Sequence, residues 1–146
     1  MGHVKPRKSR ALAVREVAHI MPAVADFLRL DNWEVRHLEY GFDKRSNQKH
    51  GEPGMADLQC IRYAYPGLRD SIYSPQGRIT LRREAEVLWI ELKSISGILD
   101  AEQRGWIMAR RLAGALVWVA KEDFPPTIEG FMEHYRASGL LVREGL

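Results

Sequence analysis

Cysteine is almost missing from this 146-residue chain, and so are long apolar runs and internal repeats. The single cysteine, Cys60, cannot form a disulfide within the chain, which excludes a zinc site built from several cysteines and favours a reducing compartment. No apolar stretch approaches the roughly 20 residues that cross a membrane as a helix. The N-terminus is basic but has no apolar segment of its own, so we expect no signal peptide.

The positive charge is small and unevenly distributed. The formal net charge is +3 and the sequence pI is about 9.2, which alone is too weak to indicate a nucleic-acid partner. Residues 1–15 contain five lysines and arginines and no acid, so the rest of the chain is close to neutral. We expect residues 1–10 to form a flexible basic arm and residues 11–146 to form one domain, because this length suits a single core.

Apolar spacing predicts the order of the secondary-structure elements. Residues 12–30 have helical spacing, and Pro22 either kinks this helix or begins a second one. Residues 41–54 are polar and glycine-rich and predict a loop, and residues 64–85 predict an inserted loop or hairpin. Further elements are expected as strands at 33–40, 55–63, 85–92 and 115–120, and as helices at 100–113 and 123–139.

The predicted order is therefore α-β-β-β-α-β-α. A strand, a helix and another strand near the end of the chain imply a right-handed crossover between parallel strands. The fold class is α/β or mixed α+β, with a small central mixed sheet flanked by helices.

Charged residues end the most apolar of the predicted strands. Glu91 and Lys93 are two positions apart, so their side chains point to the same side of the strand. Either the strand simply ends in solvent, or these charges have a function, because burying an unpaired charge is costly. Asp57, at the start of an earlier strand, would on its own be interpreted as a turn or capping residue.

Taken together, the three residues place two carboxylates and an ammonium near one another. Mg²⁺ is typically held by one or two carboxylates, waters and phosphate oxygens. The ion polarises a phosphate and lowers the pKa of a bound water, and a nearby lysine orients that water or offsets developing charge. This combination is suited to the hydrolysis of a phosphodiester.

The ordered pattern also resembles a known family. Its parts are Gly54-Met55-Ala56-Asp57-Leu58, then Glu91-Leu92-Lys93, then Gln103, then Gly114-Ala115 before an apolar strand. This pattern is similar to that of the VRR-NUC domain (virus-type replication-repair nuclease) of the PD-(D/E)XK nuclease superfamily, over roughly residues 14–135. The chain departs from the family in having Ala56 where proline is commoner, and in a long gap between the two acids that requires residues 64–85 to loop out.

The resemblance implies a restriction-endonuclease-like core and a set of site residues. Asp57 and Glu91 would bind Mg²⁺, with Mn²⁺ as a substitute, and Leu92 would add its backbone carbonyl. Lys93 would position the attacking water or stabilise the transition state. Gln103 would lie near the site, and it also fits a capping box with Asp100.

Other residues are candidates for supporting roles. Glu16, at the border of the apolar stripe of the first helix, would reach the catalytic cleft or would simply be solvated. Several basic residues flank the site in sequence and would either contact phosphates or remain solvated surface charges. These candidates for nucleic-acid binding are Lys44, Arg45, Lys49, His50, Arg104, Arg110 and Arg111.

The resemblance implies a divalent-metal-dependent DNA endonuclease in the cytoplasm of a bacterial or phage-infected cell. Branched DNA such as a Holliday junction is the first expected substrate, and a homodimer is expected because cutting two symmetric strands needs two sites. One alternative is a non-specific or single-strand nuclease of the same fold. Others are a nucleic-acid-binding module without catalytic activity and a small domain that serves as an assembly partner.

Overall fold

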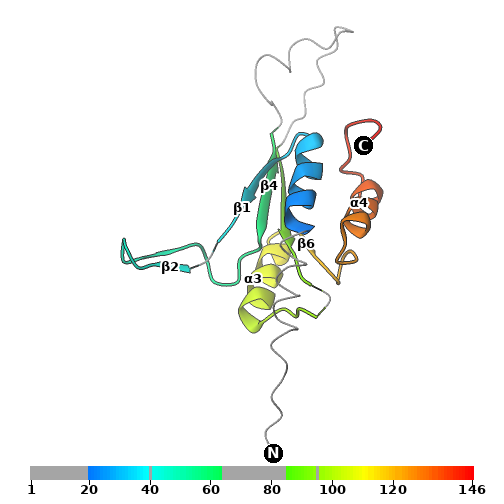
Figure 1. The fold of residues 1–146 in the computed structure, drawn as a ribbon. Coiled ribbons are helices and arrows are strands. Elements are labelled where there is room, and N and C mark those ends of the chain that lie inside the picture. Colours follow the sequence, from blue (N-terminus) through cyan, green and yellow to red (C-terminus); the bar gives the residue numbers. More distant parts are fainter. Residues whose placement is uncertain (1–19, 40, 64–84, 95) are drawn as a thin grey trace, which may run out of the picture.

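A small mixed sheet forms the centre of the protein. The computed structural model describes residues 20–39, 41–63, 85–94 and 96–146. In this part of the chain one sheet has the order β1-β4-β5-β6, and β4 pairs antiparallel with β1 and β5, whereas β5 and β6 are parallel (Figure 1). Its strands are β1 (Glu34–His37), β4 (Leu58–Arg62), β5 (Glu86–Glu91) and β6 (Leu116–Val119). The predicted mixed sheet and its parallel pair are therefore confirmed.

Helices cover both faces of this sheet. Residues 20–30 are helical and, together with α4 (Ile128–Ala137), pack on one face, while α3 (Ala101–Leu112) packs on the other. The mixed α+β class is thus confirmed. None of the helices in the described ranges is long and apolar enough to span a membrane.

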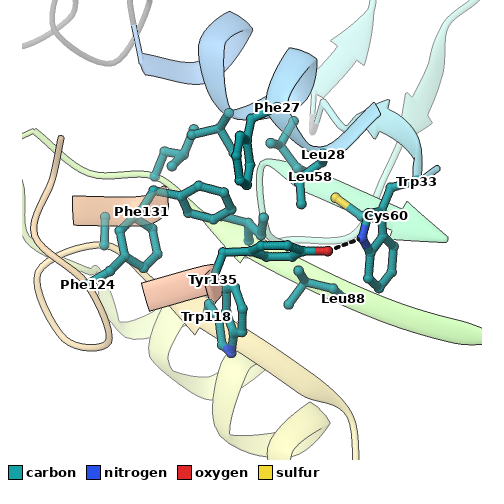
Figure 2. Packing of buried hydrophobic residues seen from close by; sticks show 14 residues of the cluster. Phe27, Leu28, Trp33, Leu58, Cys60, Leu88, Trp118, Phe124, Phe131 and Tyr135 are labelled. Carbon is teal, nitrogen blue, oxygen red and sulfur yellow. Dashed lines mark hydrogen bonds between the residues drawn. The ribbon is translucent and has the colours of Figure 1, made fainter. Parts of the chain in front are cut away.

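The larger core lies between the sheet and the helix pair. Phe27 and Leu28 meet Phe131 and Tyr135 over the inward-facing side chains of β4 and β5, as Figure 2 shows. The ring of Tyr135 packs edge-on against Phe27, with 5.4 Å between centroids. A smaller cluster, which includes Ala56, Trp106, Ile107, Val117 and Val119, fills the α3 side. The two clusters hold β5 between them, which explains its nearly continuous apolar sequence.

A buried polar network fastens the C-terminal segment to this core. Asp31 is fully buried and accepts hydrogen bonds from the Tyr135 hydroxyl and from the guanidinium of Arg62 at 2.8 Å. It also accepts from the backbone N–H groups of Val142 and Arg143. Because a buried carboxylate needs such partners, Asp31 connects the end of the first helix to the last residues of the chain.

Two predicted segments differ in the structure. Residues 41–54 are not only a loop, since β2 (Gly41–Asp43) and β3 (Gln48–His50) pair as an antiparallel hairpin. The residues of β3 are all exposed, so they lack the apolar alternation by which a half-buried strand is recognised. The last helix begins at Ile128 rather than near 123, because Thr127 caps it by accepting from the N–H of Gly130.

Several expectations lie outside the described residues. They concern the basic arm at 1–10, Glu16 in the first helix, and nearly all of the proposed insertion at 64–85. Pro22 lies within the helical residues 20–30 and is exposed, while the choice between a kink and a helix start depends on earlier residues.

Candidate active site

The register of two neighbouring strands brings the two predicted acids together. Asp57 immediately precedes β4, and Glu91 is the last residue of β5. Leu58 is paired with Ile90 in the antiparallel register, so Asp57 comes opposite Glu91. The carboxylate of Asp57 also accepts a hydrogen bond from the N–H of Leu92 at 2.7 Å, which fixes it beside the end of β5.

Lys93 and Gln103 complete a cluster around Glu91. The Nζ of Lys93 lies 2.9 Å from Oε1 of Glu91 and donates to Oε1 of Gln103 at 3.0 Å. The amide nitrogen of Gln103 donates to the same Glu91 oxygen at 2.7 Å. Each of the three side chains therefore contacts the other two, as the alternation along the strand predicts for Glu91 and Lys93.

The start of α3 places Gln103 in this cluster. Asp100 is the N-cap, and its side chain accepts from the N–H of Gln103 at 2.8 Å, while Gln103 Oε1 accepts from the N–H of Asp100 at 3.1 Å. The predicted capping box is thus confirmed. Since Gln103 Nε2 remains available for Glu91, the capping role and the contact with the site are compatible.

Gly54 explains how the loop before Asp57 approaches the same helix. Its φ is +75°, a left-handed conformation that favours glycine, and a Cβ built there would lie 2.3 Å from the carbonyl oxygen of Glu102. The backbone of the loop therefore packs directly on the first turn of α3. The glycine of the G-x-x-D pattern is needed to place Asp57 and Gln103 next to each other.

Burial changes the proton affinity of both acids. Glu91 is only 1% exposed, and its pKa is raised to about 7, first because burial penalises the charged form and then because Asp57 is near. Burial also raises the pKa of Asp57, although the N–H of Leu92 and the charges of Lys93 and His37 oppose the rise. A pair of carboxylates with raised pKa values beside a lysine is typical of a functional site.

One oxygen of the pair lacks a protein partner in the described ranges. Oε2 of Glu91 is buried and makes no hydrogen bond of normal geometry with the described residues, although the backbone N–H of Asp57 helps to lower the pKa of this carboxyl. A buried oxygen without a partner ordinarily costs about 1–3 kcal/mol. A bound cation would satisfy this oxygen. The residues fit a Mg²⁺ ion, which needs only one or two carboxylates and keeps several waters, although no group of three His, Cys, Asp or Glu gathers within the described ranges.

The candidate nucleic-acid-binding residues fall into two groups. Four of them, Lys44, Arg45, Lys49 and His50, are exposed on the β2–β3 hairpin, and Arg104 is exposed on α3.

The other two arginines make contacts within the protein. Arg110 donates to Glu52 at 2.6 Å and stacks over Trp106. Arg111 donates to the carbonyl of Val117 at 3.0 Å and to Asp123 at 2.9 Å. Their first role is therefore structural.

Sequence reasoning missed two residues near the site. Glu52 accepts a hydrogen bond from the indole N–H of Trp106 at 2.8 Å, and this bond and Arg110 lower its pKa. His37 is the smallest of the influences that oppose the rise in the pKa of Asp57, after the N–H of Leu92 and the charge of Lys93. Only one signal was available for Glu52: an indole on a helix near a site needs an acceptor, and a polar loop can supply one.

Comparisons of the chain with protein-family models, with curated proteins and with solved structures gave no match. Function is therefore inferred from the geometry of Asp57, Glu91, Lys93 and Gln103 and from the resemblance in the pattern of these residues.

Proposed function

We propose that the protein is a divalent-metal-dependent DNA endonuclease that hydrolyses phosphodiester bonds. The observation that carries this proposal is the buried Oε2 of Glu91, which has no hydrogen-bond partner in the described residues and lies next to a second carboxylate and an ammonium. A buried acid with an unsatisfied oxygen is costly for a purely structural site. The same arrangement is useful for holding a cation against a phosphate.

Each residue has a distinct role in the proposed reaction. Asp57 and Glu91 would hold Mg²⁺ or Mn²⁺, together with the backbone carbonyl of Leu92. Such an ion, when bound, polarises a phosphate and lowers the pKa of a bound water. Lys93 would offset the negative charge that develops on the phosphate.

Gln103 would act as a positioning residue in this site. Its side chain bonds both Glu91 and Lys93, and its place is fixed by the capping box at the start of α3. The geometry of the acid and of the lysine is thus tied to a helix end rather than to a loop. A rigid arrangement of this kind reduces the cost of ordering the site during the reaction.

The proposed substrate is branched DNA of the Holliday-junction type, and the proposed active form is a homodimer. Both follow from the resemblance to VRR-NUC domains. Two symmetric cuts need two copies of a site that is present once in the described part of each chain.

A cleavage assay tests the proposal directly. Linear duplex, single-stranded and four-way-junction DNA are incubated with the protein in Mg²⁺, in Mn²⁺ and in EDTA. Glu91→Ala and Lys93→Ala should abolish cutting and leave DNA binding largely intact, while Glu129→Ala, an exposed acid on α4, serves as the matched control. Cutting that persists in EDTA, or full activity in both site variants, would refute the proposal.

The same assay separates the alternatives. A non-specific or single-strand nuclease would cut the linear or single-stranded DNA as well as the junction. A nucleic-acid-binding module would bind DNA without cutting it under any metal condition. The exposed basic residues of the β2–β3 hairpin are the feature that favours this second function.

A further inference from the structure

The β2–β3 hairpin stands apart from the main sheet. Its strands pair with each other, with Asp43 opposite Gln48, and form a separate two-stranded sheet that extends away from the body in Figure 1. Residues 44–47 form the turn, and Asn47 takes a left-handed φ of +54° there. An isolated two-stranded hairpin is marginally stable in water, so a hairpin of this kind is expected to gain stability from a partner.

Positive charge is concentrated on this hairpin. Lys44 and Arg45 occupy its turn, and Lys49 and His50 lie on β3. Every residue from 44 to 50 is exposed, and none of them is acidic. Together with Asp43 on β2, the one acid of the hairpin, these residues leave a net positive charge that suits a polyanion, and Lys44 and Lys49 carry two of its exposed cations.

The root of the hairpin is held against the candidate active site. A Cβ at Gly51 would lie 2.5 Å from the carbonyl oxygen of Glu39, so the two ends of the hairpin approach closely. The N–H of Leu38 donates to the carbonyl of Asp57 at 2.8 Å. Glu52, the residue after the root, is bound by Trp106 on α3. The hairpin is thus tied both to the strand of Asp57 and to the helix of Gln103.

We propose that the β2–β3 hairpin is a ribbon that enters the major groove of B-form DNA beside the scissile phosphate. The major groove is about 12 Å wide and admits a two-stranded ribbon, whereas the minor groove, at about 6 Å, is too narrow. A-form RNA has a deep, narrow major groove that such a ribbon cannot enter. This inference rests on the proposed function and narrows its substrate to DNA with a duplex segment next to the cut.

Binding measurements in EDTA test the ribbon separately from catalysis. The probes are a fluorescein-labelled DNA duplex, its single strand and an RNA duplex of the same sequence, each followed by anisotropy at several salt concentrations. The variant Lys44→Gln/Lys49→Gln removes two charges from the hairpin. The control Arg29→Gln/Arg143→Gln removes two charges from exposed positions away from it. Thermal unfolding checks that both variants are folded.

The hairpin variant should bind the DNA duplex roughly tenfold more weakly than the control at ~0.1 M salt. Each lost phosphate contact lowers the slope of log K against log salt by about 0.9, so the slope should fall by about 2. The wild type should bind the RNA duplex more weakly than the DNA duplex, and the two variants should bind the RNA duplex with nearly the same affinity.

Three results would overturn the ribbon. The first is that both variants bind the DNA duplex with equal affinity. The second is that the hairpin variant loses as much affinity for single-stranded DNA or for the RNA duplex as it loses for the DNA duplex. The third is that the wild type does not bind the DNA duplex. If the hairpin binds the DNA duplex but the protein cuts no DNA with Mg²⁺, the proposed nuclease activity would be refuted and the proposed binding of the hairpin to DNA would stand. The two proposals therefore fail in distinguishable ways.

Discussion

Replacing Glu91 with glutamine should make the protein more stable at neutral and alkaline pH. The pKa of Glu91 is raised from 4.5 to about 7 in the folded protein, mainly by burial. Between these two values the folded protein holds a proton that the unfolded chain has released. The free energy of unfolding of the wild type should therefore fall as the pH rises through this window, and the penalty is complete above pH 7.

The size of this penalty follows from the pKa values. At about 1.4 kcal/mol per pH unit, a rise from 4.5 to about 7 corresponds to about 3 kcal/mol. Glutamine has nearly the same shape, and its oxygen can accept the hydrogen bonds that Gln103 and Lys93 now donate to Glu91. The variant therefore removes the charge and keeps most of the packing.

The assay is urea unfolding at pH 5, 6, 7 and 8 in EDTA. The wild type is compared with Glu91→Gln and with the control Glu133→Gln, a change at an exposed position of α4. The free energy of unfolding of Glu91→Gln should exceed that of the wild type by a small amount at pH 5 and by about 3 kcal/mol at pH 8. A difference that does not change with pH, or a variant that is less stable than the wild type at pH 8, would refute this reasoning.

Three further predictions test the site and the fold. Mg²⁺ at 100 times its Kd should stabilise the wild type by about 2.7 kcal/mol at pH 7.5, measured by thermal unfolding, and an equal gain in Glu91→Gln would contradict the metal site. Gly54→Ala should lower the free energy of unfolding by about 1–3 kcal/mol through backbone strain. The total loss should be larger, because the added Cβ would also clash with the backbone of α3. Gly139→Ala, also at positive φ but with open space around it, is the control, and equal losses would contradict the close approach. Asp31→Ala should cost about 3–5 kcal/mol because Arg62 loses its buried ion-pair partner and keeps only the partly exposed Glu86, and a loss below 1 kcal/mol in urea unfolding would contradict this.

Local patterns account for most of the elements that were predicted correctly. Asp100 and Gln103 predict the start of α3 because a capping box is made within four residues. Gly114 follows the end of that helix with a φ of +90°, which is a local requirement as well. β5 is predicted because a strand covered on both faces is apolar on both.

Other elements depend on what surrounds them. The residues of β3 are all exposed, so this stretch of sequence has no apolar alternation and predicts a loop. The last helix begins after Pro125 and Pro126, because Thr127 supplies a cap that a prediction from 123 onward did not use. No local pattern predicted the buried hydrogen-bond network of Asp31, because its partners lie about 30 to 110 residues further along the chain.

The sequence by itself predicted that Glu91 and Lys93 would point to the same side at the end of the apolar strand, because side chains alternate along a strand. Their side chains do meet, although β5 ends at Glu91 and Lys93 lies just beyond it. The sequence also placed Gln103 in the first turn of a helix. Only the tertiary structure decided that Asp57 stands opposite Glu91, since that depends on the register between β4 and β5. The tertiary structure also decided that Glu91 is buried with a raised pKa. Desolvation depends on elements packed from distant parts of the chain, and no local pattern contains that information.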